Sequence, residues 1–146
     1  MYIISSCLLG NNCKYDGGNN ENRKVIEFYK KHSCCTVCPE TMGGLASPRM
    51  PAEIVGDKVI DKAGLDKTRA FEIGALRAWE HVLKQAERRR EKIEGAILKS
   101  NSPSCGNGKI YDGTFSKRLT QGDGIFVRIL KENNIKIISE KEIDLW

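Results

Sequence analysis

Short apolar runs alternate with amphipathic helical segments along the chain, and this alternation restricts the possible folds more than any other feature. Four runs have the length and the apolar or β-branched composition of buried strands, at residues 2–6, 34–38, 95–98 and 135–139. Segments with helical periodicity separate them. Such a pattern predicts a parallel sheet that is covered by helices on both faces. We therefore expect a small three-layer α/β domain, similar to a Rossmann fold, with a mostly parallel sheet of about four strands.

Three segments carry apolar residues at intervals of three and four positions, which is typical of helices that bury one face. They lie at about residues 22–31, 66–91 and 123–134. The spacing places Val25, Ile26 and Tyr29 on the buried face of the first helix, and Leu83 on that of the second. Asp123 has a suitable side chain for the N-cap of the third helix.

The rest of the chain contains a predicted hairpin and no linker. Residues 53–60 have the pattern of two short strands that turn at Gly56-Asp57. No low-complexity tract interrupts the sequence, and 146 residues are the length of one domain. We expect a single domain over residues 1–146.

The composition is that of a globular protein with a mild excess of positive charge. No run reaches the roughly 18 uncharged apolar residues that a membrane helix needs. Residues 1–7 contain no basic leader, so we expect a cytoplasmic protein without a membrane partner. The formal net charge of +5 favours anionic ligands but is too small to predict nucleic-acid binding. The basic run Arg88-Arg89-Arg90 is explained by solvation of a helix end, which leaves contact with RNA as the weaker hypothesis.

The positions of the cysteines give the strongest functional signal. In a reducing compartment, six cysteines indicate metal binding or catalysis rather than a disulfide framework. Cys7 follows the first predicted strand, Cys38 ends the second and Cys105 lies in the loop after the third. Parallel sheets bind ligands outside the carboxyl ends of their strands. The alternative, that the cysteines are small buried hydrophobic residues, suits Cys34 and Cys35. It suits Cys105 poorly, because its loop consists of Ser, Asn, Pro and Gly.

Several kinds of thiol site are compatible with this arrangement. Cys35 and Cys38 form a C-x-x-C pair, but a zinc site would need a second pair or suitably spaced histidines. A thioredoxin-type pair should begin a helix, whereas Pro39 is expected to end a strand. Three separated thiolates suit a cubane iron–sulfur cluster with one iron open. Cys13 is a candidate fourth ligand, which would close that site.

Two polar residues near these cysteines are candidates for proton transfer. Glu40 lies two positions after Cys38, and Ser102 lies three before Cys105. A carboxylate beside a partly buried cluster can move protons at neutral pH. The structural alternatives are an ion pair between Glu40 and Arg49, and a turn-closing hydroxyl at Ser102.

Two Tyr-Asp-Gly triplets accompany the cysteines. Tyr15-Asp16-Gly17 follows Cys7, and Tyr111-Asp112-Gly113 follows Cys105, at unequal distances. Asp and Gly in succession favour turns. The unequal spacing indicates a shared turn chemistry rather than an internal duplication.

Together these motifs resemble the thiouracil desulfidase family, which was long known only as a domain of unknown function. The likeness runs nearly end to end and is carried by Ser6-Cys7-Leu8-Leu9-Gly10, Cys38-Pro39-Glu40, Ser102-Pro103-Ser104-Cys105-Gly106 and Tyr111-Asp112-Gly113-Thr114-Phe115. The resemblance implies an enzyme that converts a thiolated pyrimidine such as 2-thiouracil into the oxo base and sulfide without redox chemistry.

The resemblance also implies a [4Fe–4S] cluster held by three cysteines, which correspond to Cys7, Cys38 and Cys105. The iron without a protein ligand would receive the substrate sulfur, and Glu40 and Ser102 would assist by proton transfer and by orienting water or substrate. Members of the family often lack a cysteine at the position of Cys13. Purification in air can leave such a protein without its cluster.

Two alternatives to the enzyme remain open at this stage. One is a metal-binding or sulfide-carrier module without its own turnover, and the other is a modest RNA-binding protein that uses the basic helix end. A free base, a nucleoside and a thiolated tRNA all stay open as substrates, as does the oligomeric state.

Overall fold

A parallel sheet forms the centre of the computed structural model, which describes all 146 residues. Its strands are β1 (Tyr2–Ser5), β2 (Cys34–Val37), β5 (Gly95–Leu98) and β8 (Ile137–Ser139). Their order across the sheet is β2-β1-β5-β8, and every neighbouring pair is parallel. After β1 the chain adds β2 on one side and later adds β5 on the other, so the direction of winding reverses at β1. The predicted α/β fold with a sheet of about four parallel strands is confirmed.

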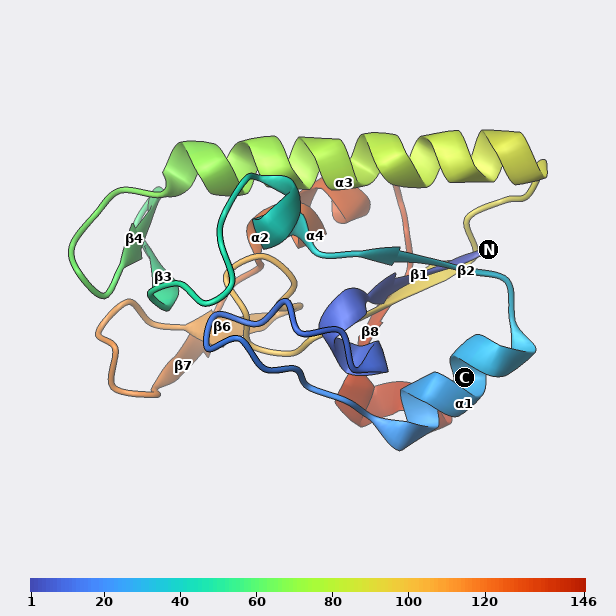
Figure 1. Ribbon diagram of the computed structural model, residues 1–146, viewed down its shortest axis with the longest axis horizontal. Coiled ribbons are helices and arrows are strands. Elements are labelled where there is room, and N and C mark those ends of the chain that lie inside the picture. The colour runs from blue at the N-terminus through green and yellow to red at the C-terminus, as the bar shows by residue number, and fades with distance from the viewer.

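Helices cover both faces of the sheet and complete three layers (Figure 1). The elements of one face are α3 (Thr68–Arg89) and α4 (Ile125–Glu132), and those of the other are α1 (Arg23–Lys31) and the 3-10 helix η2 (Glu140–Leu145). Successive residues of a strand point to opposite faces. Ile3 therefore packs in the core under α3 and α4, whereas Ile4 packs in the core under α1 and η2. No helix is both long and apolar enough to cross a membrane.

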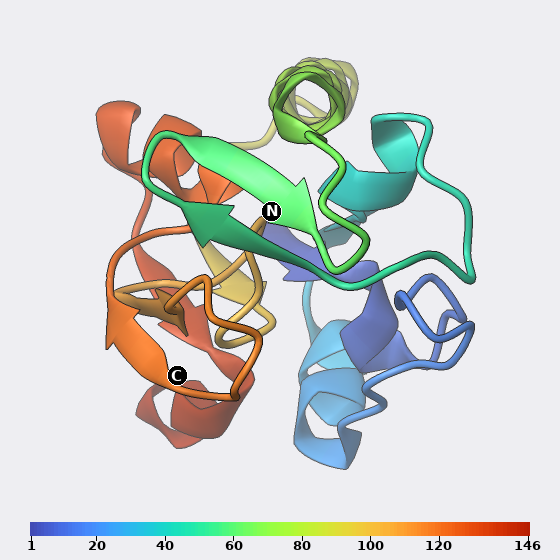
Figure 2. The ribbon, with the colours of Figure 1, turned by 90° about the vertical axis from the view of Figure 1, so that its left-hand side faces the viewer.

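Short elements gather at the carboxyl edge of the sheet, where β1, β2 and β5 end. They are η1 (Ser6–Leu9), α2 (Pro39–Met42), the hairpin of β3 (Ala52–Val55) and β4 (Lys58–Asp61), and the hairpin of β6 (Lys109–Tyr111) and β7 (Leu119–Gln121). Figure 2 shows this edge turned toward the viewer. A small third core, formed by Ile54, Val59, Phe71 and Ile110, joins both hairpins to α3. The first hairpin was predicted, but the second was not, because every residue of β7 is exposed.

Three details of the predicted helices are wrong. Tyr29 was expected on the buried face of α1 but is 42% exposed. Phe28 occupies that face instead. Leu83 is 45% exposed, so the buried stripe of α3 is narrower than its spacing indicated. Asp123 does not cap α4, because its carboxylate instead accepts a hydrogen bond of 2.8 Å from the backbone N–H of Gly108.

Helices α2 and α3 approach each other so closely that no side chain fits between them. A methyl group on Gly74 would overlap the carbonyl oxygen of Pro39, and one on Gly43 would overlap that of Ala70. Pro39 was expected only to end a strand, but it also begins α2, with Cys38 as the N-cap. Proline suits the first turn because its missing N–H would have no partner there. The contact therefore fixes the helix that follows Cys38.

Replacing the α3 glycine tests this contact. Alanine is better than glycine inside a helix by about 1 kcal/mol, so an unhindered site would be stabilised by Gly74→Ala. Here the methyl group collides with α2, and overpacking typically costs about 1–3 kcal/mol. We expect urea titration to show a free energy of unfolding lower by about that amount. The exposed Glu72→Ala on the same helix should change it by less than about 0.5 kcal/mol. A Gly74→Ala protein at least as stable as the wild type would contradict the close approach.

Candidate functional site

The ends of three adjacent strands meet at one cavity of about 370 Å³. Cys7 lies in η1 after β1, Cys38 directly follows β2, and Cys105 lies in the loop after β5. All three line the cavity, and none is in a disulfide. The structure thus brings together the three cysteines that the sequence singled out.

Local hydrogen bonds hold two of these cysteines in place. The carbonyl oxygen of Cys7 accepts hydrogen bonds from the N–H groups of Asn20, at 2.9 Å, and Gly10, at 3.3 Å. Gly10 has a φ of 92°, which a residue with a side chain rarely adopts. The N–H of Cys105 donates to Ser102 Oγ at 2.7 Å. Both thiols are therefore carried by closed turns rather than by loose loops.

The thiols differ in their pKa values for identifiable reasons. Burial is the main cause that raises the pKa of Cys105 to about 12; a hydrogen bond with Ser5 opposes it, and the neighbouring Cys7, Cys38 and Glu40 add to it as potential anions. Burial also raises the pKa of Cys7. In contrast, a hydrogen bond from the Cys13 thiol lowers the pKa of Cys38 to about 6. The cavity therefore concentrates groups that repel one another once they ionise, and a cationic partner would relieve this repulsion.

The other cysteines divide into two groups. Cys34 and Cys35 are buried in β2 on opposite faces of the sheet and do not line the cavity. Both are packed as small hydrophobic residues, and Cys35 forms no disulfide with Cys38. Cys13 does line the cavity, and its carbonyl oxygen lies 4.0 Å from the Cys38 sulfur.

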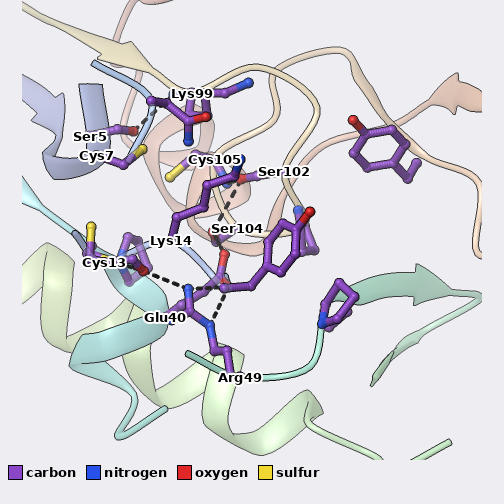
Figure 3. Close-up of a pocket in the computed structure, with 18 of the residues that line it drawn as sticks. Ser5, Cys7, Cys13, Lys14, Glu40, Arg49, Lys99, Ser102, Ser104 and Cys105 are labelled. Carbon is purple, nitrogen blue, oxygen red and sulfur yellow. Dashed lines mark hydrogen bonds and ion pairs between the residues drawn. The ribbon is translucent and has the colours of Figure 1, made fainter. Parts of the chain in front are cut away.

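Glu40, in the first turn of α2, is held from both sides (Figure 3). Its Oε1 accepts hydrogen bonds from Arg49 Nη2, at 3.0 Å, and Nε, at 3.2 Å. Its Oε2 accepts one from Ser104 Oγ at 2.7 Å. The same Arg49 Nη2 donates to the carbonyl oxygen of Cys13 at 2.9 Å. The ion pair considered as a structural alternative is present, and it leaves Glu40 on the cavity wall.

The Ser102 hydroxyl forms no hydrogen bond with Glu40. Its Oγ lies 3.3 Å from Ser104 Oγ, so Ser104 stands between the two predicted residues. The turn-closing role proposed for Ser102 is present as well, through the N–H of Cys105. Sequence reasoning missed Ser104, although its position two residues after Ser102 was a usable signal.

A second charged cluster carries Lys99 to the cavity. Glu140, the first residue of η2, accepts hydrogen bonds from Ser100 N, at 2.8 Å, and Ser100 Oγ, at 2.7 Å. Lys99 Nζ lies 3.3 Å from the same carboxylate. The backbone N–H of Lys99 also donates to Ser5 Oγ at 3.0 Å. Sequence analysis did not find this cluster, because Glu140 lies 40 residues away from Ser100.

The donor set distinguishes between kinds of metal group. No three His, Cys, Asp or Glu side chains lie close enough to hold a single metal ion. A cubane cluster binds each thiolate through a different iron and so accepts more widely separated ligands. Soft thiolates also select iron–sulfur clusters over hard cations. Three free thiols around one cavity therefore fit a [4Fe–4S] cluster better than a mononuclear zinc site.

The whole chain is similar to known proteins. The model of a family described as 2-thiouracil desulfurase matches residues 2–142. The uncharacterized protein YbbK of Bacillus subtilis (strain 168) is 34% identical, over 99% of this chain and 98% of that protein. The solved structure of the [4Fe–4S]-dependent thiouracil desulfidase TudS has a TM-score of 0.83 and 35% sequence identity, over 98% of this chain and 92% of that chain.

The cluster around Glu140 should make stability depend on pH. Burial raises the pKa of this carboxyl, but hydrogen bonds from Ser100 and the charge of Lys99 outweigh it and bring the pKa below its ordinary 4.5. A carboxyl whose pKa is lowered by folding stabilises the fold at pH values above its pKa in the unfolded state. This stabilisation is lost as the pH falls through the pKa of the folded state. We expect Glu140→Gln to lose about 1–3 kcal/mol of unfolding free energy at neutral pH.

Urea titrations at several pH values check this expectation. The difference between wild type and Glu140→Gln should shrink as the pH falls below the ordinary 4.5 of a glutamate. The exposed Glu132→Gln serves as the control and should show no such trend. A difference independent of pH would mean that the charge of Glu140 does not stabilise the fold.

Proposed function

This chain belongs to the 2-thiouracil desulfurase family, and on that premise we propose that it hydrolyses the C–S bond of a thiolated pyrimidine. The substrate resembles 2-thiouracil, and the products are the oxo base and sulfide. Water supplies the oxygen of the new carbonyl group, and its two protons leave with the sulfur as hydrogen sulfide. No electron is transferred overall.

One observation carries this proposal: three free cysteines share a cavity with a carboxylate that is already hydrogen-bonded. Cys7, Cys38 and Cys105 are proposed as the ligands of a [4Fe–4S] cluster. When bound, this cluster would supply a soft Lewis-acid iron for the sulfur of a thione. Similarity to the [4Fe–4S]-dependent desulfidase TudS over 98% of this chain supports the choice of cofactor.

Glu40 is proposed to move the protons of the reaction. Arg49 holds Oε1 through two N–H groups, which fixes the direction of Oε2. Oε2 can then accept a proton from the attacking water and return it to the departing sulfur. A positioned general acid/base of this kind typically accelerates a reaction by about 10²–10⁴-fold.

The two serines extend this hydrogen-bonded arrangement toward Cys105. Ser104 donates to Glu40, and Ser102 lies next to Ser104 while it holds the N–H of Cys105. Ser104 is therefore placed to relay a proton or to orient water beside Glu40. Ser102 is placed to hold the turn of Cys105 in a fixed position relative to Ser104.

Iron analysis tests the ligands directly. After anaerobic reconstitution we expect about four irons and four labile sulfides per chain in the wild type. Cys7→Ser, Cys38→Ser and Cys105→Ser should each prevent assembly of the full cluster. Cys13→Ser is the matched control, since Cys13 lines the same cavity and contacts Cys38 but is not assigned as a ligand.

Two results would contradict this assignment. A Cys38→Ser protein with a complete cluster would remove Cys38 from the ligands. Zinc without labile sulfide in the wild type would instead favour a carrier or structural module.

Removing the charge of Glu40 tests the chemical step. Glutamine has nearly the same shape and can still accept a hydrogen bond from Arg49, so Glu40→Gln should retain its iron and labile sulfide. It cannot accept the proton of water, so the rate of sulfide release from 2-thiouracil should fall about 10²–10⁴-fold. The exposed Glu72→Gln should release sulfide like the wild type. Unchanged turnover in a cluster-loaded Glu40→Gln protein would exclude Glu40 as the acid/base.

A further inference from the structure

One phenylalanine lies outside all three hydrophobic cores. Phe28, Phe71 and Phe126 are buried, and each belongs to a different core. Phe115 is only partly buried, packs in none of these cores, and lines the cavity that contains the cysteines and Glu40. An aromatic ring that the folding core does not use is available to a ligand.

The loop that carries Phe115 has an unfavourable backbone conformation. Phe115 has a φ of 55° and Lys117 one of 63°, although neither is a glycine. Both residues line the cavity. Non-glycine residues in this region are strained and persist where their surroundings impose the conformation, and such residues cluster at functional sites.

Glu53, on the first hairpin, holds the part of this loop from Gly113 to Phe115. Its side chain belongs to a residue that is only 8% exposed, and its Oε1 accepts hydrogen bonds from the N–H groups of Gly113, at 3.0 Å, and Phe115, at 3.2 Å. It forms no ion pair, so the hydrogen-bond partners of its buried carboxyl oxygen are backbone N–H groups of this loop. A side chain at Gly113 would come within 2.9 Å of the carbonyl oxygen of Ile54, which shows how tightly the loop lies against β3.

Three features together define the role of this loop: its strained backbone, the two hydrogen bonds to Glu53, and the Phe115 ring, which belongs to no hydrophobic core. We propose that Phe115 is a stacking platform for the pyrimidine ring of the substrate and that Glu53 is the positioning residue that presents it. This inference rests on the proposed function, since it concerns the same cavity. A pyrimidine is planar and has a π face, and stacking of a base on an aromatic side chain typically contributes about 1–3 kcal/mol.

Binding of uracil, the expected product, tests Phe115 without turnover. Equilibrium dialysis of cluster-loaded protein would give its Kd, and sulfide release from 2-thiouracil would give KM and kcat. Phe115→Leu keeps an apolar side chain but removes the π face. We expect its Kd and KM to rise about 5- to 150-fold with little change in kcat, since stacking holds substrate and transition state alike. Phe115→Tyr should stay within about threefold of the wild type.

Variants of Glu53 test the positioning role. Both hydrogen bonds end on one oxygen, so the amide oxygen of Glu53→Gln can replace it and should preserve the Kd and the KM. Glu53→Leu has no acceptor and should raise both values as Phe115→Leu does, while the iron content stays constant. Leu119→Ala is the matched control, because Leu119 is exposed on β7 and does not line the cavity.

The outcomes separate this inference from the proposed function. If Phe115→Leu binds uracil like the wild type, or if the wild type binds no pyrimidine, the stacking platform is wrong. If the wild type binds uracil through Phe115 but releases no sulfide, the platform stands and the proposed turnover is wrong. Glu53→Leu could fail to fold. In that case, a raised KM in Glu53→Gln, together with normal uracil binding by Phe115→Tyr, would still exclude the positioning role of the two hydrogen bonds to Glu53 Oε1.

Discussion

Parallel pairing of β2, β1 and β5 is the constraint on which the site depends. Because the three strands run side by side in one direction, the chain leaves all of them at the same edge. Cys38 and Cys7 emerge there within two residues of their strands, and the Ser102 turn brings Cys105 back to it. Burial of short apolar strands thus determines where the reactive side chains lie.

Arg49 converts this shared edge into an oriented site. Its guanidinium contacts the carboxylate of Glu40 and the carbonyl oxygens of Cys13 and Ala46, and its backbone N–H donates to Tyr15 at 2.6 Å. One side chain therefore joins α2 to two loops. A partly buried ion pair adds little net stability once desolvation is counted. Its effect here is directional, because it occupies one oxygen of Glu40 and leaves the other to Ser104.

The sequence was sufficient to predict what depends on periodicity and on strand ends. The sheet, the long α3 helix and the convergence of Cys7, Cys38 and Cys105 all follow from local patterns. Interactions between distant segments were not visible, and these include the pairing of Glu140 with Ser100 and the insertion of Ser104 beside Glu40. Hydrogen bonds between residues 40 or 64 positions apart cannot be predicted from local composition or periodicity.

The repeated Tyr-Asp-Gly triplet shows how local chemistry can recur without duplication. In both copies the aspartate Oδ1 accepts the N–H two residues later, Gly18 at 2.9 Å and Thr114 at 3.0 Å. Both triplet glycines have positive φ, 81° and 91°. The first triplet lies between η1 and α1, whereas the second begins at the last residue of β6 and continues into the turn before β7, so the surrounding elements are unrelated. Both tyrosines nevertheless line the same cavity. On each side of the cavity, an Asp-Gly turn presents a tyrosine side chain to it. This shared local requirement explains the repeated triplet better than a duplication of one half of the chain.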